Sequence, residues 1–344
     1  MSARESIIPI FVPHLGCPNN CVFCNQRRIS GSLTPATAED VERAIENAST
    51  LPRSGGKRQL AFYGGSFTAI PAEEQEKLLA AAKKYIDKGE LDSIRLSTRP
   101  DAIDSRVLKR LADYGVETVE LGAQSMNDEV LRLSGRGHTA ADVADAAKQV
   151  KSAGFRLILQ MMTGLPGDSE ERSIETARQL IALRPDGVRI YPTVIVKDTA
   201  LCDMWRQGKY REHSVEDAVR VCAKLVPLFK EAGIPIIRLG LNPTDELSGG
   251  SAVAGAYHPA LGELVKSRIM YERACEVLKD VKQGSRVVLG VRQDKISQMT
   301  GQHRANVQKL TEKFGLKSLK IKAAAAGEDE IILLSAEASA TKKI

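Results

Sequence analysis

The chain has 344 residues, of which 43% are hydrophobic and 27% are charged, a composition typical of a globular protein with a substantial core. No run of about 18 apolar residues is present, which excludes a membrane-spanning helix, and the first residues lack the features of a signal peptide. Six cysteines, three clustered and three scattered, do not form the pattern of a disulfide framework. We therefore expect a cytoplasmic protein.

The net charge of +6 is concentrated near the C-terminus. Residues 284–322 hold nine Lys or Arg and two acidic residues, so this segment alone carries +7. Such an excess suggests contact with a polyanion. Charge alone, however, more often reflects a solvated lysine-rich surface.

From residue 6 to about 238, short apolar runs alternate with segments of helical periodicity. Thr37 and Asp40 have the spacing of a capping box at the start of the first helix. The expected strands lie within residues 6–12, 59–65, 93–99, 116–124, 155–167 and 186–196, with a possible seventh at 234–240. The expected helices are residues 34–48, 71–86, 104–115, 127–135, 139–154, 169–183 and 214–233.

This alternation predicts a parallel sheet with right-handed crossovers, either a barrel or a doubly wound sheet. Glycine or polar residues follow nearly every expected strand, as in "YGG", "STRPD" and "TGLPG". Active sites of barrels lie at the carboxyl ends of the strands, so these signals favour a partial (β/α)6 barrel of the TIM type over an open sheet.

The region beyond this barrel is expected to be organised differently. Residues 239–283 read as a long loop followed by a helix. A composition shift at Gly284 begins a run of strand, helix, tight turn, helix, strand and strand that ends near residue 336. We expect three parts: a barrel at 1–238, a connection at 239–283, and a small basic α+β domain at 284–344 with a frayed tail.

Cys17, Cys21 and Cys24 have the spacing C-x3-C-x2-C, which places three thiolates in eight residues. Zinc would need a remote fourth ligand, such as His14 or His138. A redox pair of Cys21 and Cys24 would leave Cys17 without a role. An iron–sulfur cube held by three thiolates would leave one iron open for another ligand.

With Phe23 directly before Cys24, this motif resembles the cluster signature of the radical S-adenosylmethionine (radical SAM) superfamily. The resemblance implies a [4Fe–4S] cluster on Cys17, Cys21 and Cys24 whose open iron is chelated by S-adenosylmethionine, and one-electron cleavage that yields a 5′-deoxyadenosyl radical. It also implies that Phe23 packs near the adenine, although an ordinary core phenylalanine explains this residue equally well.

The same resemblance assigns cofactor contacts to the ends of the other strands. Ser66 stands where the family usually has an acid, and Arg99 could instead form an ion pair with Asp101. The residues implied to contact S-adenosylmethionine are Phe23, Gly64, Gly65, Ser66, Ser97, Arg99, Gln124 and Gly164.

Residues 97–139, 161–168 and 190–210 resemble the radical SAM domain of the Elongator catalytic subunit, which modifies wobble uridine in tRNA. The similarity covers roughly residues 7–238, and Ser97 stands where that family has Glu. Elongator subunits also carry an acetyltransferase domain, and the residues after Gly284 are too few for one. The acetyl-CoA chemistry of that family is therefore not transferred.

The C-terminal residues resemble a KH-type RNA-binding module, in which a turn between two helices clamps the backbone of single-stranded RNA. The turn here is Gly301, Gln302, His303 and Arg304, with Arg304 in place of the second glycine. A small dimerisation or docking module is the alternative.

Together these patterns predict a radical SAM enzyme that modifies tRNA or rRNA, with RNA and an electron donor such as flavodoxin or ferredoxin as partners. One alternative is a radical SAM enzyme acting on a small metabolite such as a porphyrinogen. Another is a non-enzymatic RNA-binding protein with a structural metal. His138 and Tyr191 are further candidates for the site, and no catalytic base is assigned.

Overall fold

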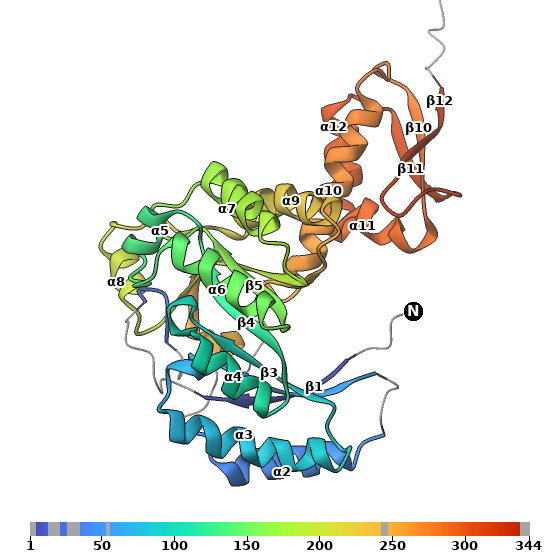
Figure 1. The fold of residues 1–344 in the computed structure, drawn as a ribbon. Coiled ribbons are helices and arrows are strands. Elements are labelled where there is room, and N and C mark those ends of the chain that lie inside the picture. The colour runs from blue at the N-terminus through green and yellow to red at the C-terminus, as the bar shows by residue number, and fades with distance from the viewer. Residues whose placement is uncertain (1–4, 13–20, 26–34, 53–55, 242–246, 338–344) are drawn as a thin grey trace, which may run out of the picture. The chain divides into compact units, whose positions relative to one another are not determined.

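A computed structural model describes most of the chain (Figure 1). The described residues are 5–12, 21–25, 35–52, 56–241 and 247–337. Within them, no helix has the length and apolar character needed to cross a membrane.

Tertiary contacts divide the chain into two compact units, which we treat separately. The barrel unit comprises Met1–Ala218 and Leu225–Pro259, and the C-terminal unit comprises Val219–Lys224 and Ala260–Ile344.

The sheet of the barrel unit is parallel and follows the order of the chain. In the described part of this unit its strands are β1 (Ser6–Phe11), β2 (Arg58–Tyr63), β3 (Ser93–Thr98), β4 (Val116–Gln124), β5 (Arg156–Thr163), β6 (Gly187–Pro192) and β8 (Ile236–Leu239). A doubly wound sheet reverses its strand order at one point, and this sheet does not. The expected partial barrel is therefore confirmed, with the possible seventh strand present as β8.

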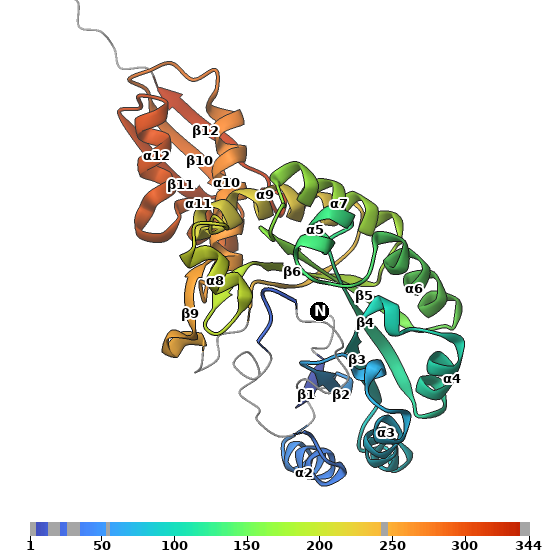
Figure 2. The ribbon, with the colours of Figure 1, turned by 90° about the vertical axis from the view of Figure 1, so that its left-hand side faces the viewer.

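Helices cover the outer side of these strands, as Figure 2 shows for α3, α4, α6 and α7. Leu96, Leu121 and Leu159, on the side of the sheet that packs against helices, are fully buried. The capping box of Thr37 and Asp40 is present. The helices of this part of the chain are α2 (Ala38–Ser49), α3 (Ala72–Asp87), α4 (Ser105–Asp113), α5 (Asp128–Leu133), α6 (Ala140–Ser152), α7 (Glu170–Ala182), α8 (Ala200–Arg206) and α9 (Val215–Glu231), with short 3-10 turns at Phe67–Ala69 and Pro100–Ala102.

The prediction of one strand over residues 186–196 is wrong. The N–H and the hydroxyl of Thr193 both donate to the carbonyl of Thr163, at 2.9 and 2.7 Å, and β6 ends at Pro192. The chain then forms β7 (Val194–Val196), which pairs antiparallel with β9 (Ala252–Gly255) in a separate two-stranded sheet. β9 lies in a segment that was expected to be loop, after a π-helical turn at Leu247–Ser251.

The C-terminal unit places helices on one face of a three-stranded sheet. Its elements are α10 (Leu261–Leu278), β10 (Arg286–Val291), a 3-10 turn (Gln293–Lys295), α11 (Ile296–Thr300), a second 3-10 turn (Gln302–Arg304), α12 (Ala305–Lys313), β11 (Ser318–Ala323) and β12 (Ile332–Glu337). The central strand β10 pairs parallel with β11 and antiparallel with β12. The predicted order of strand, helix, turn, helix, strand and strand is confirmed.

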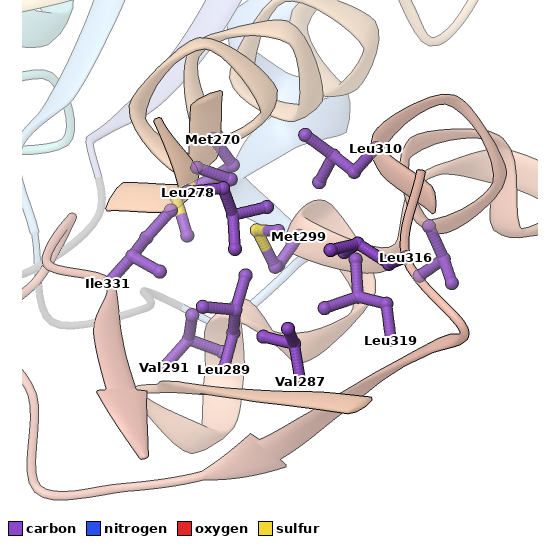
Figure 3. Packing of buried hydrophobic residues seen from close by; sticks show 12 residues of the cluster. Met270, Leu278, Val287, Leu289, Val291, Met299, Leu310, Leu316, Leu319 and Ile331 are labelled. Carbon is purple, nitrogen blue, oxygen red and sulfur yellow. The ribbon is translucent and has the colours of Figure 1, made fainter. Parts of the chain in front are cut away.

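A single apolar cluster fills the space between these helices and the sheet (Figure 3). Met299 and Leu310 of the two short helices lie against Leu289 of β10, and all three are fully buried. Because α10 adds Met270 and Leu278 to the same cluster, this helix belongs to the C-terminal unit.

Candidate functional site

The cysteine segment is anchored beside the carboxyl end of β4. Cys21 and Cys24 lie on one turn, in which the N–H of Cys24 donates to the carbonyl of Cys21 at 3.0 Å. Val22 fixes this turn from two sides: its N–H donates to Ser134 at 3.0 Å, and its carbonyl accepts from Leu201 at 2.7 Å. Cys21 is buried and Cys24 is partly exposed.

The third thiolate of the motif, Cys17, lies outside the described residues, as do His14, Arg27 and Arg28. Within the described residues no three His, Cys, Asp or Glu side chains gather as a metal site. The donor set nevertheless fits a three-thiolate cluster, because two soft ligands share one anchored turn and the third comes from the adjoining segment of sequence.

Phe23 packs against an apolar cluster formed by Ile195, Leu201 and Cys202, which Trp205 also contacts. This packing accounts for one side of the ring and makes Cys202 a small buried apolar residue, as its isolation in the sequence indicates. A contact between Phe23 and adenine stays a prediction.

Ser66, after β2, is bonded to the end of the neighbouring strand. Its hydroxyl lies 3.0 Å from that of Thr98 and accepts the N–H of Arg99 at 3.1 Å. Ser66 is buried, whereas Gly64, with a φ of 98°, and Gly65 are partly exposed at the turn. The two glycines thus leave the backbone open to a ligand, while Ser66 holds the turn against β3.

Arg99 forms the ion pair that was considered as the alternative to cofactor binding. Its Nε donates to Asp101 at 2.9 Å and its Nη2 donates to the same carboxylate at 3.0 Å and to the carbonyl of Arg136. The side chain is buried. A contact between Arg99 and S-adenosylmethionine stays a prediction, as does one for the half-buried Ser97.

Gln124 ends β4 in a strained conformation, with a φ of 66° that is uncommon for residues other than glycine. The strand is irregular between Gly122 and Gln124, and the side-chain oxygen of Gln124 accepts from Gln160 of β5 at 3.1 Å. A Cβ on Gly122 would come 2.8 Å from Nε2 of Gln124, so any larger residue there would displace the Gln124 amide. The strand end therefore presents a preformed pair of amides.

Gly164 supports a side chain that the sequence did not reveal. Its φ is 75°, and a Cβ there would lie 2.2 Å from Cγ of His213. The His213 Nε2 lies 3.1 Å from the hydroxyl of Thr163. Gly164 itself is held by two hydrogen bonds: its carbonyl accepts from the Tyr210 hydroxyl at 2.5 Å, and its N–H donates to the Asp168 carboxylate at 2.8 Å. No local pattern pointed to His213, because its partner lies some fifty residues earlier.

His138 is hydrogen-bonded to the main chain at the end of β4. Its Nε2 donates to the carbonyl of Ala123 at 3.2 Å, and it is 4% exposed. Burial, and then the nearby charge of Arg136, lower the pKa of His138 to about 4, so the imidazole is neutral near pH 7.

The inner face of the sheet carries a buried ionic network. Arg189 of β6 donates to both carboxylate oxygens of Glu120 on β4, at 2.7 and 3.0 Å, and to the hydroxyl of Tyr63 on β2 at 3.0 Å. Arg95 of β3 lies 3.5 Å from the same carboxylate. Burial, and then Glu120, raise the pKa of Tyr63 to about 12. Burial lowers the pKa of Arg189, but the opposing effects of Glu120, Tyr191 and Tyr63 together raise it.

This network was not predicted, although Arg95, Glu120 and Arg189 are charged residues in the middle of expected strands. Tyr191, the other further candidate for the site, lies next to this network on β6, and burial raises its pKa. On the inner face, therefore, Glu120 is hydrogen-bonded to Arg189 and Tyr63. Partly exposed residues lie nearer the carboxyl ends of the strands: Ser97, Gln160, Met162 and Tyr191.

Comparisons with known proteins agree with this arrangement. The model of the radical SAM superfamily matches residues 11–180, and that of the Radical_SAM C-terminal domain matches residues 185–271. The archaeal Elp3 of Methanocaldococcus infernus, solved with an N-terminal deletion, superposes with a TM-score of 0.61 at 21% identity, covering 83% of this chain and 67% of that one.

Among curated relatives, an uncharacterized protein of Methanocaldococcus jannaschii is 31% identical over 289 residues, which is 79% of this chain and 84% of that protein. Human Elongator complex protein 3 is 31% identical over 204 residues, or 54% of this chain, but the match spans only 37% of the human protein. The chain belongs to the radical SAM superfamily, whose members bind a [4Fe–4S] cluster and S-adenosylmethionine, and it is related to the Elongator catalytic subunits.

Proposed function

We propose that this chain is a radical SAM enzyme that modifies RNA. The observation that carries the RNA assignment is the exposed turn Gly301–Arg304 between α11 and α12, in a basic unit beyond the barrel. The relation to Elongator complex protein 3 supports the same substrate class.

The turn has an unusual backbone conformation. Gly301 has a φ of 77°, and His303 and Arg304, which are not glycines, have φ values of 49° and 63°. Residues held in this region cost of order 1 kcal/mol each and are frequent at ligand-binding sites. The helix α12 that follows has no side-chain cap, so the N–H groups of its first turn are suited to a phosphate oxygen.

Asn306 holds this turn in place. Its side-chain amide lies within 2.9–3.3 Å of four acceptors: the carbonyl and hydroxyl of Ser267 on α10, and the carbonyls of Gln298 and Met299 on α11. A Cβ on Gly301 would come 3.0 Å from the main-chain N of Asn306. The turn is therefore rigid before any ligand arrives, which reduces the entropic cost of binding.

The charge of the unit supports a polyanionic ligand. His303, Arg304, Lys309, Lys317, Lys320 and Lys322 are all exposed. The acidic residues 328–330 follow the basic segment, and Arg292 is paired with Asp294, so the positive charge is local to the turn, α12 and β11.

The barrel unit would hold the cofactors. Cys21 and Cys24, with Cys17, would bind the cluster, and Gly64, Gly65, Gln124 and Gly164 at the strand ends would approach S-adenosylmethionine. When bound, these cofactors would supply a 5′-deoxyadenosyl radical, and the buried pair of Glu120 and Arg189 would help to exclude water from the inner face of the sheet. We propose a cytoplasmic setting with flavodoxin or ferredoxin as electron donor.

The activity is tested by anaerobic incubation of the reconstituted protein with S-adenosylmethionine, a strong reductant and total RNA from a strain that lacks the enzyme. We expect 5′-deoxyadenosine together with one altered nucleoside in mass spectrometry. Formation of 5′-deoxyadenosine without any altered nucleoside would favour a small metabolite as substrate.

The RNA contact is tested separately by measuring affinity for single-stranded RNA against salt concentration. Arg304→Ala is expected to weaken binding and to reduce the salt slope by about 1, because one phosphate contact is lost. Lys109→Ala, an exposed lysine on α4 of the barrel unit, is the control and is expected to leave the slope unchanged. Equal slopes for Arg304→Ala and the wild type would contradict the assignment of the turn.

A further inference from the structure

The segment between α5 and α6 contains a buried arginine in a turn flanked by two glycines. Arg136 stands between Gly135, with a φ of 66°, and Gly137, with a φ of 73°. Its main-chain N–H donates to Leu131 at 3.0 Å, its carbonyl accepts from Arg99, and the residue is 7% exposed. The backbone is thus fixed on both sides of the side chain.

The guanidinium group of Arg136 points at the cysteine segment. Its Nη2 donates to the carbonyl of Gly122 at 2.8 Å, and its Nη1 donates to Sγ of Cys21 at 3.4 Å. Gly122 makes room for this contact, because a Cβ there would come 3.2 Å from Nη2. The position of Cys21 is fixed as well, since the N–H of the next residue, Val22, donates to the carbonyl of Ser134, two residues before Arg136.

We propose that Arg136 is a positioning residue that donates an N–H···S hydrogen bond to the cluster ligand Cys21 and thereby raises the reduction potential of the cluster. Reduction adds negative charge, which the thiolate ligands share. A cationic donor in a buried site stabilises that charge more than the charge of the oxidised state, and hydrogen bonds to the sulfurs are one of the main determinants of cluster potentials.

This inference rests on the cluster that superfamily membership implies and does not depend on RNA being the substrate. The other buried arginines near the strand ends direct their guanidinium groups to carboxylates: Arg99 to Asp101, and Arg189 to Glu120. The contact with a thiol sulfur therefore distinguishes Arg136 from both.

The test is a potentiometric titration of the anaerobically reconstituted cluster, followed by electron paramagnetic resonance of the reduced state. Arg136→Met keeps the length of the side chain but removes the charge and the donors. We expect its potential to be more negative by at least 59 mV, which is a tenfold change in the one-electron equilibrium. Arg136→Lys keeps the charge but loses the planar fork, and we expect a smaller shift in the same direction.

Arg58→Met is the matched control. Arg58 is also buried and also donates to a carbonyl, that of Leu51 at 2.9 Å, but it begins β2 and so lies at the opposite end of the strands. We expect its potential to equal that of the wild type. Iron and sulfide per chain are measured for every variant, so that a potential is read only from assembled clusters.

A wild-type potential in Arg136→Met with full iron content would overturn the proposal, and so would an equal shift in Arg58→Met. If Arg136→Met assembles no cluster, the titration of Arg136→Lys decides, and a wild-type potential there would also overturn it. If Arg136→Met loses RNA modification while its potential is unchanged, the role of Arg136 in setting the potential is contradicted, but the proposal that RNA is the substrate is not.

Discussion

The two units of this chain prepare for their ligands in different ways. In the barrel unit the buried arginines are paired with carboxylates, as Arg99 is with Asp101 and Arg189 with Glu120. In the C-terminal unit the candidate turn is exposed, and its distinctive property is the backbone conformation of His303 and Arg304. The first arrangement orients particular chemical groups, whereas the second offers a surface to any chain of phosphates.

This difference has a consequence for mutagenesis. In the barrel unit a change at the site also changes the packing, so stability and activity are expected to fall together. In the C-terminal unit an exposed side chain of the turn can be removed with little cost in stability, because such surface changes usually stay within about 0.5 kcal/mol. The predictions below probe this contrast in order of the expected effect.

The largest effect is expected from Cys24→Ser. Loss of one of three thiolates should abolish retention of the cluster, and with it the release of 5′-deoxyadenosine. Iron and sulfide analysis after anaerobic reconstitution measures this directly. Cys275→Ser, which alters a half-buried cysteine of the C-terminal unit, should retain the iron; loss of iron there would mean that the sequence motif does not define the cluster site.

Glu120→Gln removes the charge that Arg189 faces in the barrel interior. Breaking a buried ion pair by removing one partner costs about 3–5 kcal/mol, and urea denaturation would measure the change in free energy of unfolding. Glu74→Gln is the control, since Glu74 pairs with Lys77 at an exposed position on α3 and should change stability by less than about 0.5 kcal/mol. Similar values for the two variants would show that the network does not stabilise the barrel.

Gly164→Ala places a methyl group where the ring of His213 lies and also forces alanine into a positive φ. We expect a loss of about 3 kcal/mol, of which the steric part is about 2 kcal/mol and the backbone part about 1 kcal/mol. Gly154→Ala has the backbone cost alone, because its φ is 85° and nothing lies within 4 Å of a Cβ there. The double variant Gly164→Ala with His213→Gly should recover the steric part, because both the ring and the Cβ of residue 213, which would lie 2.4 Å from the new methyl group, are then absent; no recovery would contradict the contact.

Asn306→Ala is expected to have the smallest effect on stability, and this effect should be confined to the turn of the C-terminal unit. Loss of its amide contacts should destabilise the C-terminal unit by about 1–2 kcal/mol and increase hydrogen exchange at Gly301–Arg304. Gln308→Ala, which removes an exposed contact with Glu312 on the same helix, is the control. Unchanged exchange in Asn306→Ala would show that the turn is rigid for another reason.

Local patterns predicted the elements well, because each reflects signals within the element itself. Residues 116–124 were expected as a strand and form β4, and Thr37 and Asp40 form the expected capping box. The break between β6 and β7 was missed, because it depends on a hydrogen bond from Thr193 to Thr163, thirty residues earlier.

The side chains of the site were predicted less completely, for the same reason. The resemblance pointed to Gln124 and Gly164 but not to what surrounds them. Arg136 and His213 acquire their partners only when distant segments meet, and neither residue follows a strand or stands in a periodic pattern. The glycines on both sides of Arg136 were the one local signal, and no prediction was based on them.

The anchoring of Val22 has a consequence for how the protein is made. The cysteine segment leaves the ribosome before its anchors, Ser134 and Leu201, which are synthesised more than a hundred residues later. Each strand of the sheet meanwhile pairs with the strand made before it. Most strands of the sheet can therefore pair in step with translation, whereas Cys21 and Cys24 reach their final positions only after α8 has emerged. The site for iron consequently becomes complete only once the chain has been made through α8.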